Sequence, residues 1–150
     1  MEWIKTSPIE DARFKENKTL IIYCDGGARG NPGPAGAGAV IMNDDGFVLG
    51  KLSEYLGVAT NNQAEYQAVL LALQEAVALG AKTIHLYLDS ELVVRQLTGE
   101  YRVKNENIKN LFLETRKQIQ KLSDFKVVHI PREKNEEADK LVNQAINLGV

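Results

Sequence analysis

The stretch "LIIYCDGGARGNPGPAGAGAVIM", residues 20–42, decides the fold because two apolar runs flank a turn rich in glycine and proline. Short apolar runs bounded by such turns are typical of strands, so we predict strands over residues 20–24 and 36–42. A third strand is predicted over residues 47–55, after the turn signal NDDG. The domain is therefore expected to open with a meander of three antiparallel strands.

Helical spacing follows this meander. Apolar residues recur at intervals of three and four from Tyr66 to Val77, between a cap at Thr60 or Asn61 and a stop at Gly80. The order βββαβααβα predicts an α/β fold, with a five-stranded mixed sheet of three antiparallel strands and then parallel βα units, flanked by helices. The later elements are predicted as a strand over 83–88, helices over 90–98 and 107–122, a strand over 125–130 and a helix over 135–147.

Length and composition place one domain over residues 19–150. The 150 residues are 44% hydrophobic, which suits a single buried core. Residues 1–18 are expected to form an N-terminal arm or a short helix. Trp3 could pack this segment against the domain, or the segment could remain a mobile arm. A net charge of −2 provides no global basic field, so nucleic-acid binding would need a local basic strip.

Localisation is expected to be cytoplasmic. Cys24 is the single cysteine, so no internal disulfide is possible. No secretory signal pattern opens the chain, and no apolar run approaches the roughly 20 residues that span a bilayer. We expect a monomer without membrane contact.

Four acidic residues stand where they could converge. Asp25 and Asp89 end the first and fourth predicted strands, and ligands gather at the carboxyl ends of parallel strands. Glu65 is expected in the first turn of the long helix, and Asp139 lies beside the apolar stripe of the last. Two like charges about 4 Å apart repel by roughly 4 kcal/mol at an effective dielectric of 20. Such a cluster calls for a hard cation, Mg²⁺ or Mn²⁺.

Four motifs carry a resemblance to a known family. They are "YCDGGARGNPGPAGAGAVI", "TNNQAE", "YLDSELVV" and "HIPREKNEEADKLVNQA", in this order along residues 19–145. In these motifs the chain resembles type 1 ribonuclease H, the ribonuclease HI-like family. The resemblance implies a ribonuclease H-like fold and a metal-dependent endonuclease that hydrolyses the RNA strand of RNA–DNA hybrids. It also implies a two-metal-ion mechanism that leaves 5′-phosphate and 3′-hydroxyl ends.

The resemblance assigns the metal ligands to Asp25, Glu65, Asp89 and Asp139. Two Mg²⁺ ions are expected, with Mn²⁺ as a substitute. Asp25 would bridge both ions, with Asp139 on the ion that activates water and the other two acids on its partner. A non-catalytic nucleic-acid-binding module is the rival hypothesis. The presence of all four acids of the family pattern favours the hypothesis of an active enzyme. Duplex RNA stands as an alternative substrate.

Substrate contacts are predicted after Asp25 and at the start of the long helix. Loop amides and carbonyls would face the minor groove of a hybrid, where 2′-hydroxyls distinguish RNA from DNA. The alternatives are ordinary turn chemistry for the glycines, capping for Thr60 and a first-turn acid for Glu91. The predicted contacts are Gly26, Gly27, Ala28, Asn31, Thr60, Asn61, Asn62 and Glu91.

The chain departs from the family pattern in three places, one of which is Glu91, where the family often has a glutamine. His129 has the spacing of the family's mobile catalytic histidine, yet it sits in an apolar strand pattern. Arg132 in the following loop is the alternative catalytic helper, and both stay candidates. The lysine-rich protrusion of many bacterial members is missing between the third and fourth acids, which predicts weaker, salt-sensitive substrate binding.

Overall fold

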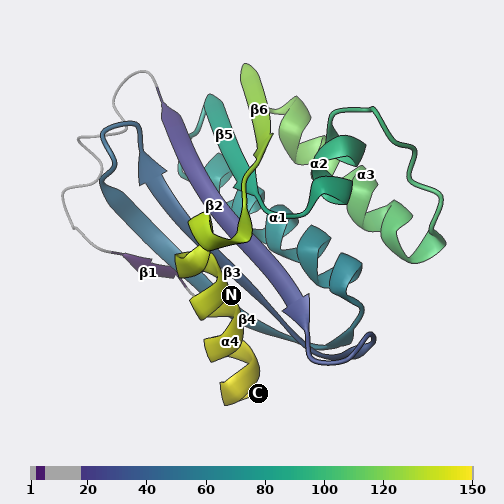
Figure 1. Cartoon of the computed structure of the whole chain (residues 1–150). Helices are drawn as coiled ribbons and strands as arrows, with labels where there is room; N and C mark the ends of the chain where they lie inside the picture. The colour runs from purple at the N-terminus through teal and green to yellow at the C-terminus, as the bar shows by residue number, and fades with distance from the viewer. Residues whose placement is uncertain (1–2, 6–17, 150) are drawn as a thin grey trace.

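A computed structural model describes residues 3–5 and 18–149. Its centre is a mixed sheet in the order β1-β4-β3-β2-β5-β6 (Figure 1). The pairs β1–β4, β4–β3 and β3–β2 are antiparallel, whereas the pairs β2–β5 and β5–β6 are parallel. The strands are β1 (Trp3–Lys5), β2 (Thr19–Ala28), β3 (Gly33–Asn43), β4 (Val48–Ala59), β5 (Thr83–Leu88) and β6 (Asp124–His129).

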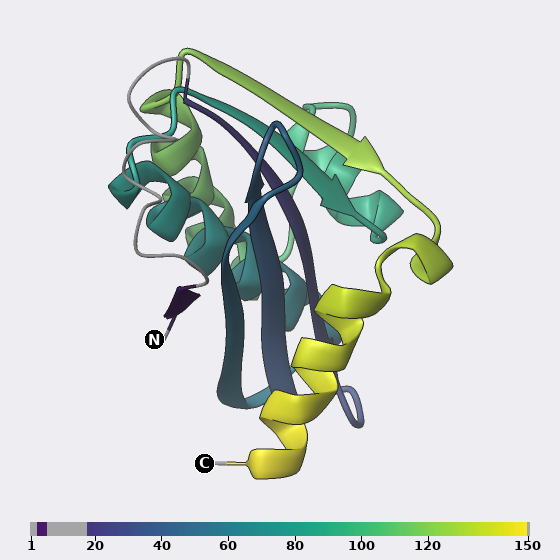
Figure 2. The same ribbon diagram turned by 90° about the vertical axis from the view of Figure 1, so that its left-hand side faces the viewer.

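Helices cover both faces of the sheet. α1 packs on one face, with α2 and α3 beside it, and α4 lies on the other (Figure 2). A continuous core of hydrophobic side chains, mostly aliphatic but including Tyr66, fills the space between the sheet and α1, α2 and α3. None of the helices in residues 18–149 is long and apolar enough to span a bilayer. The helices are α1 (Asn61–Ala78), α2 (Glu91–Leu97), α3 (Glu106–Gln120), the 3₁₀ turn η2 (Arg132–Lys134) and α4 (Glu136–Leu148).

The predicted order of elements is confirmed from β2 to α4. α1 begins where a capping box forms: the Thr60 hydroxyl accepts from the Gln63 amide, and the Gln63 side chain accepts from the Thr60 amide. α2 begins after Ser90, which caps it as expected. Residues 98–105 join α2 to α3 as a loop without a further helix, in keeping with the missing protrusion.

The prediction for the N-terminal segment needs correction. Trp3–Lys5 is neither a helix nor a loose arm, because it forms strand β1 on the edge of the sheet beside β4, in agreement with the alternative that Trp3 docks on the body. Within residues 3–5 and 18–149 the sheet is therefore six-stranded, with the five predicted strands plus this short addition. A search of the sequence for alternating apolar and polar residues misses such a strand, since three residues are too few to show alternation. The rest of the segment for which an arm or a short helix was expected, residues 1–2 and 6–17, lies outside the described residues.

Two glycines let helices approach the sheet closely. A β-carbon on Gly26 in β2 would stand 2.1 Å from the carbonyl oxygen of Ala64 in α1. On the other face, a β-carbon on Gly38 in β3 would stand 2.3 Å from the carbonyl oxygen of Ala138 in α4. Both positions therefore require glycine for close backbone approach rather than for a turn. These two contacts bring the acids of α1 and α4 toward β2.

Candidate active site

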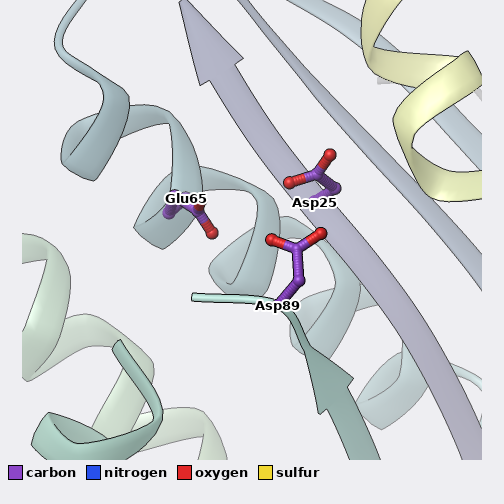
Figure 3. A group of neighbouring side chains, drawn as sticks. All are labelled: Asp25, Glu65 and Asp89. Carbon is purple, nitrogen blue, oxygen red and sulfur yellow. The ribbon is translucent and has the colours of Figure 1, made fainter. Parts of the chain in front are cut away.

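Three carboxylates meet at one edge of the sheet. One oxygen each from Asp25, Glu65 and Asp89 lies within 4.8 Å of the others. Figure 3 shows the three side chains turned toward one another from β2, α1 and the end of β5. Acids that together span more than sixty positions of the sequence thus form one cluster, as the sequence predicted for these three.

The register of two parallel strands brings Asp25 and Asp89 together. Tyr23 pairs with Tyr87 at the end of the β2–β5 ladder, so the residues two positions further along each strand lie side by side. Asp25 does not end its strand as predicted. β2 continues to Ala28 and Asp25 pairs with Gly38 of β3, so the aspartate is held within the sheet.

Glu65 reaches the cluster from the second turn of α1. The prediction of a first-turn acid is wrong, because α1 starts at Asn61 and its first turn contains no acidic residue. Stabilisation of the helix dipole fades beyond the first turn and therefore does not explain Glu65. The close approach of Gly26 to Ala64 fixes the distance between this part of α1 and β2.

Burial and mutual repulsion dominate the electrostatics of the cluster. Burial, with the charges of Asp89 and Asp139, raises the pKa of Asp25 from its ordinary 3.8 to about 7. Hydrogen bonding to the Asp139 side chain raises the pKa of Asp25 further. Burial, followed by the charges of Asp25 and Asp89, raises the pKa of Glu65 well above its usual range. Without a cation, the cluster resists full ionisation at neutral pH.

Asp139 lines the same cavity but does not belong to the group of three. Its carboxylate pairs with Arg132 at 3.7 Å and accepts a hydrogen bond of 3.5 Å from the Asn143 amide. Asn143 in turn accepts from the Arg29 guanidinium at 3.4 Å. The cavity, about 520 Å³, is lined by these residues and by all three clustered acids.

The two candidate helpers differ in placement. Arg132 lines the cavity, and its charge lowers the pKa of Glu65 against the larger effect of burial. His129 is the exposed last residue of β6, opposite Leu88, and does not line this cavity. The short connection from β6 to α4 holds one 3₁₀ turn rather than a glycine-containing loop.

Several predicted substrate residues have internal partners. The side-chain oxygen of Asn61 accepts a hydrogen bond from the backbone N–H of Ala28 at 2.9 Å. The backbone N–H of Asn61 donates to the side-chain oxygen of Asn31 at 3.0 Å. These bonds attach the β2–β3 loop to the start of α1. Gly27, Ala28 and Asn61 still line the cavity. The capping alternative for Thr60 is the contact that the structure contains.

The other predicted contacts lie further out. Glu91 is the first residue of α2 and pairs with Arg95 at 2.9 Å. This arrangement matches the alternative of a first-turn acid, and Glu91 does not line the cavity. Asn62 is exposed in the first turn of α1 and is also absent from the cavity wall.

Comparison with known proteins agrees with the resemblance. Residues 23–145 match a family model described as "Reverse transcriptase-like". Ribonuclease HI of Halobacterium salinarum is 40% identical over 125 residues, covering 83% of this chain and 63% of that protein. The solved structure of LC11-RNase H1, a compost protein, in complex with RNA/DNA hybrid is 45% identical, with a TM-score of 0.82 over 86% of this chain and 97% of that one. The chain belongs to the ribonuclease HI-like family.

Family membership confirms the ribonuclease H-like fold predicted from the motifs. The chain spans 63% of the length of the Halobacterium protein. It spans 35% of the "Bifunctional protein Rv2228c" of Mycobacterium tuberculosis, to which it is 39% identical over 85% of its own length. The shared part is thus a ribonuclease HI-like domain within longer relatives.

The cluster in this ribonuclease HI-like chain fits a hard divalent cation. Its donors are carboxylate oxygens, the ligands that Mg²⁺ and Mn²⁺ prefer. Burial first, and then the neighbouring carboxylates, raise the pKa values of Asp25 and Glu65, and the opposing effects of the Gly26 backbone and Arg132 do not offset this rise. Arg132 is the cation that lowers the pKa of Glu65, yet its side chain is 81% exposed and therefore compensates weakly.

Three residues of this ribonuclease HI-like site were missed by the sequence analysis. Arg29 and Asn143 line the cavity, and the signal for Asn143 was its position four residues after Asp139 on one face of a helix. Asn135 was taken only as the start of the last helix. Its side chain instead bonds to Asp89, which no local pattern reveals.

Proposed function

We propose that this chain is a ribonuclease H that requires divalent cations and hydrolyses the RNA strand of RNA–DNA hybrids. The convergence of Asp25, Glu65 and Asp89 in a polar cavity carries this proposal. The relative LC11-RNase H1 has been solved with an RNA/DNA hybrid, which supports the same substrate here. The reaction is a phosphodiester hydrolysis that leaves 5′-phosphate and 3′-hydroxyl ends.

The clustered acids and Asp139 would hold two Mg²⁺ ions. When bound, such ions activate a water and stabilise the leaving oxygen of a phosphodiester. Asp25 belongs to the cluster with Glu65 and Asp89 and also feels the charge of Asp139, which raises its pKa. This link to every other acid of the site suits a bridging ligand. The side chains hold their positions through the sheet register and the helix contacts described above, so they need little rearrangement to bind.

Arg132 takes the accessory electrostatic role in this proposal. Its guanidinium is exposed at the cavity and stands 3.7 Å from Asp139, where it can contact a phosphate oxygen of the substrate. His129 has no such place at the cavity wall. The helper is therefore assigned to Arg132 rather than to His129.

Discrimination of the RNA strand would come from the loop attached to α1. Asn31 and Asn61 hold this loop in one conformation, and Gly27 and Ala28 present backbone groups at the cavity. A hybrid shows its 2′-hydroxyls in a wide, shallow minor groove, which a rigid backbone surface can read. Asn61 also offers an exposed side chain at this position.

The direct test is cleavage of an RNA–DNA hybrid with a separate label on each strand. Wild type is assayed with Mg²⁺, with Mn²⁺ and with EDTA, beside duplex RNA and duplex DNA. We expect cation-dependent cutting of the RNA strand of the hybrid, with ends that a 5′-phosphate-dependent exonuclease accepts. Cutting of both strands, or cutting that persists in EDTA, contradicts the proposal.

Two matched variants accompany this assay. Asp25→Asn removes one carboxylate of the cluster, and we expect it to abolish cleavage. Asp44→Asn removes an exposed carboxylate on the turn between β3 and β4, far from the cluster in the sheet register, and should cleave like wild type. Tight binding of the hybrid by wild type without cleavage would favour the non-catalytic binding module.

A further inference from the structure

Asn135 is the most deeply buried polar side chain next to the cluster. It separates η2 from α4 and is 1% exposed. Asparagine at a helix start usually caps the helix through its side-chain oxygen. Asn135 makes no such bond, so its amide serves another purpose.

The Asn135 amide joins two strands at the point where the acids emerge. Its Nδ2 donates to the carbonyl oxygen of Cys24 at 2.9 Å and to Oδ2 of Asp89 at 3.1 Å. Cys24 directly precedes Asp25, and Asp89 directly follows β5. One side chain from the α4 side of the site therefore links the backbone at one acid to the carboxylate of another.

The orientation of this amide is determined by its neighbours. An asparagine amide has two protons on nitrogen, and Asn135 directs both to acceptors. The flipped orientation would place its oxygen against a carbonyl and a carboxylate. Oδ1 is buried and has no hydrogen-bond partner among the described residues, a cost that a purely structural apolar residue would avoid.

We propose that Asn135 is a positioning residue that orients the Asp89 carboxylate for cation binding. The backbone ladder between β2 and β5 ends at Tyr23 and Tyr87, before either acid is reached. Beyond that point, the Asn135 amide bridges the two strands in place of a ladder hydrogen bond. Among residues 3–5 and 18–149, one oxygen of Asp89 accepts this hydrogen bond and the other accepts none, which leaves the second for a cation.

This inference deepens the proposed function and rests on its cation site, so its test measures cation binding without substrate. Titration calorimetry with Mn²⁺ is performed on the full chain for wild type, Asn135→Ala, Asn135→Leu and Asn147→Ala. Asn135→Leu keeps the volume and removes the donors. Asn147 is an exposed amide on α4 and serves as the control.

We expect the Mn²⁺ affinity to fall about 10–100-fold in both Asn135 variants, the range found when groups that orient a ligand are removed. Asn147→Ala should bind like wild type. Unchanged affinity in a folded Asn135 variant overturns the proposal. Loss of the fold in both variants also overturns it, because Asn135 would then be a structural residue.

A double-mutant cycle with Asp89→Asn separates positioning from general loosening of the site. If Asn135 acts through Asp89, Asn135→Ala should have no further effect on Mn²⁺ affinity in the Asp89→Asn background. Additive losses contradict the inference. If Asn135 and Asp89 are coupled in Mn²⁺ binding but wild type cleaves no hybrid, the proposed function alone is rejected. If wild type cleaves the hybrid and Asn135→Ala binds Mn²⁺ normally, only the positioning role is rejected.

Discussion

Gly26 of β2 and Ala64 of α1 are so close that a β-carbon at residue 26 would stand 2.1 Å from the Ala64 carbonyl oxygen. The same β-carbon would stand 2.6 Å from the backbone nitrogen of Glu65. The distance between two acids of the cluster, Asp25 and Glu65, therefore depends on a residue with no functional side chain. Since backbone atoms rather than flexible side chains block the space, α1 itself must move if the glycine is replaced.

Gly26→Ala is predicted to displace Glu65 and to weaken cation binding more than tenfold, about 1.4 kcal/mol. Overpacking of this kind typically lowers the free energy of unfolding by about 1–3 kcal/mol. Titration calorimetry with Mn²⁺ and urea unfolding measure the two effects. Gly27→Ala is the matched control, because its β-carbon would meet only Val142 at 3.8 Å. Equal cation affinity and stability in both variants would contradict the prediction.

Stability without cations should depend on pH through Asp25. Its pKa is about 7 in the folded chain against an ordinary 3.8, so the folded state holds a proton that the unfolded state releases. This stabilisation is complete below about pH 4 and is lost as pH rises through about 7. In chelator, the free energy of unfolding should fall between pH 5 and pH 8 by more than about 1.4 kcal/mol, the equivalent of one pKa unit.

Asp25→Asn should reduce this fall and make the cation-free protein more stable at pH 8 than wild type. The raised pKa of Glu65 acts in the same direction, so part of the fall remains. Asp44→Asn should keep the whole pH dependence of wild type. A pH profile of Asp25→Asn identical to that of wild type would be the opposite result.

Mg²⁺ should stabilise the folded chain, because the ion relieves the repulsion among the clustered acids. A ligand at 100 times its Kd stabilises by about 2.7 kcal/mol, which raises the Tm of a domain this size by roughly 5–10 °C. Thermal melts at pH 8 with MgCl₂, and with NaCl of equal ionic strength, measure the shift. Asp89→Asn should lose most of it, and a shift of equal size in NaCl would argue against a specific site.

Arg132→Ala should lower kcat/KM for the hybrid about tenfold or more, because hydrogen bonds to charged groups contribute about 1.5–3 kcal/mol. Its Tm should stay near that of wild type, since exposed ion pairs contribute little to stability. His129→Ala should lose less activity, and Lys134→Ala, from the same 3₁₀ turn, controls for a change of charge. A larger loss in His129→Ala would reverse the assignment.

Substrate binding should weaken as salt is added, but less steeply than for a protein that contacts many phosphates. Arg29 and Arg132 line the cavity, and the loop between α2 and α3 adds Arg102 and Lys104. Each phosphate neutralised contributes about −0.9 to the slope of log K against log salt, so a slope of roughly −2 to −4 is expected. Asp25→Asn with labelled hybrid allows the measurement without cleavage. A slope near −8 would mean that many more phosphates are contacted.

Local patterns were sufficient for the order of elements and for most of the cluster. Apolar periodicity identified α1, and a β-branched run identified β2, because burial of one face leaves a repeat in the sequence. Asp25 and Asp89 were predicted to meet because parallel neighbours place their carboxyl ends together. The structure confirms that geometry, although β2 runs past its aspartate to Ala28.

The sequence by itself determined the α/β fold, the family and the identity of the clustered acids, since these follow from periodicity and from motifs of adjacent residues. Only the tertiary structure decided that Asn135 donates a hydrogen bond to Asp89 and that Gly26 lets α1 pack close to β2. It also decided that Arg132 rather than His129 lines the cavity. Each of these depends on how closely two distant segments pack and which way a side chain then points. Such distances are set by the whole core together, and no local pattern of residues records them.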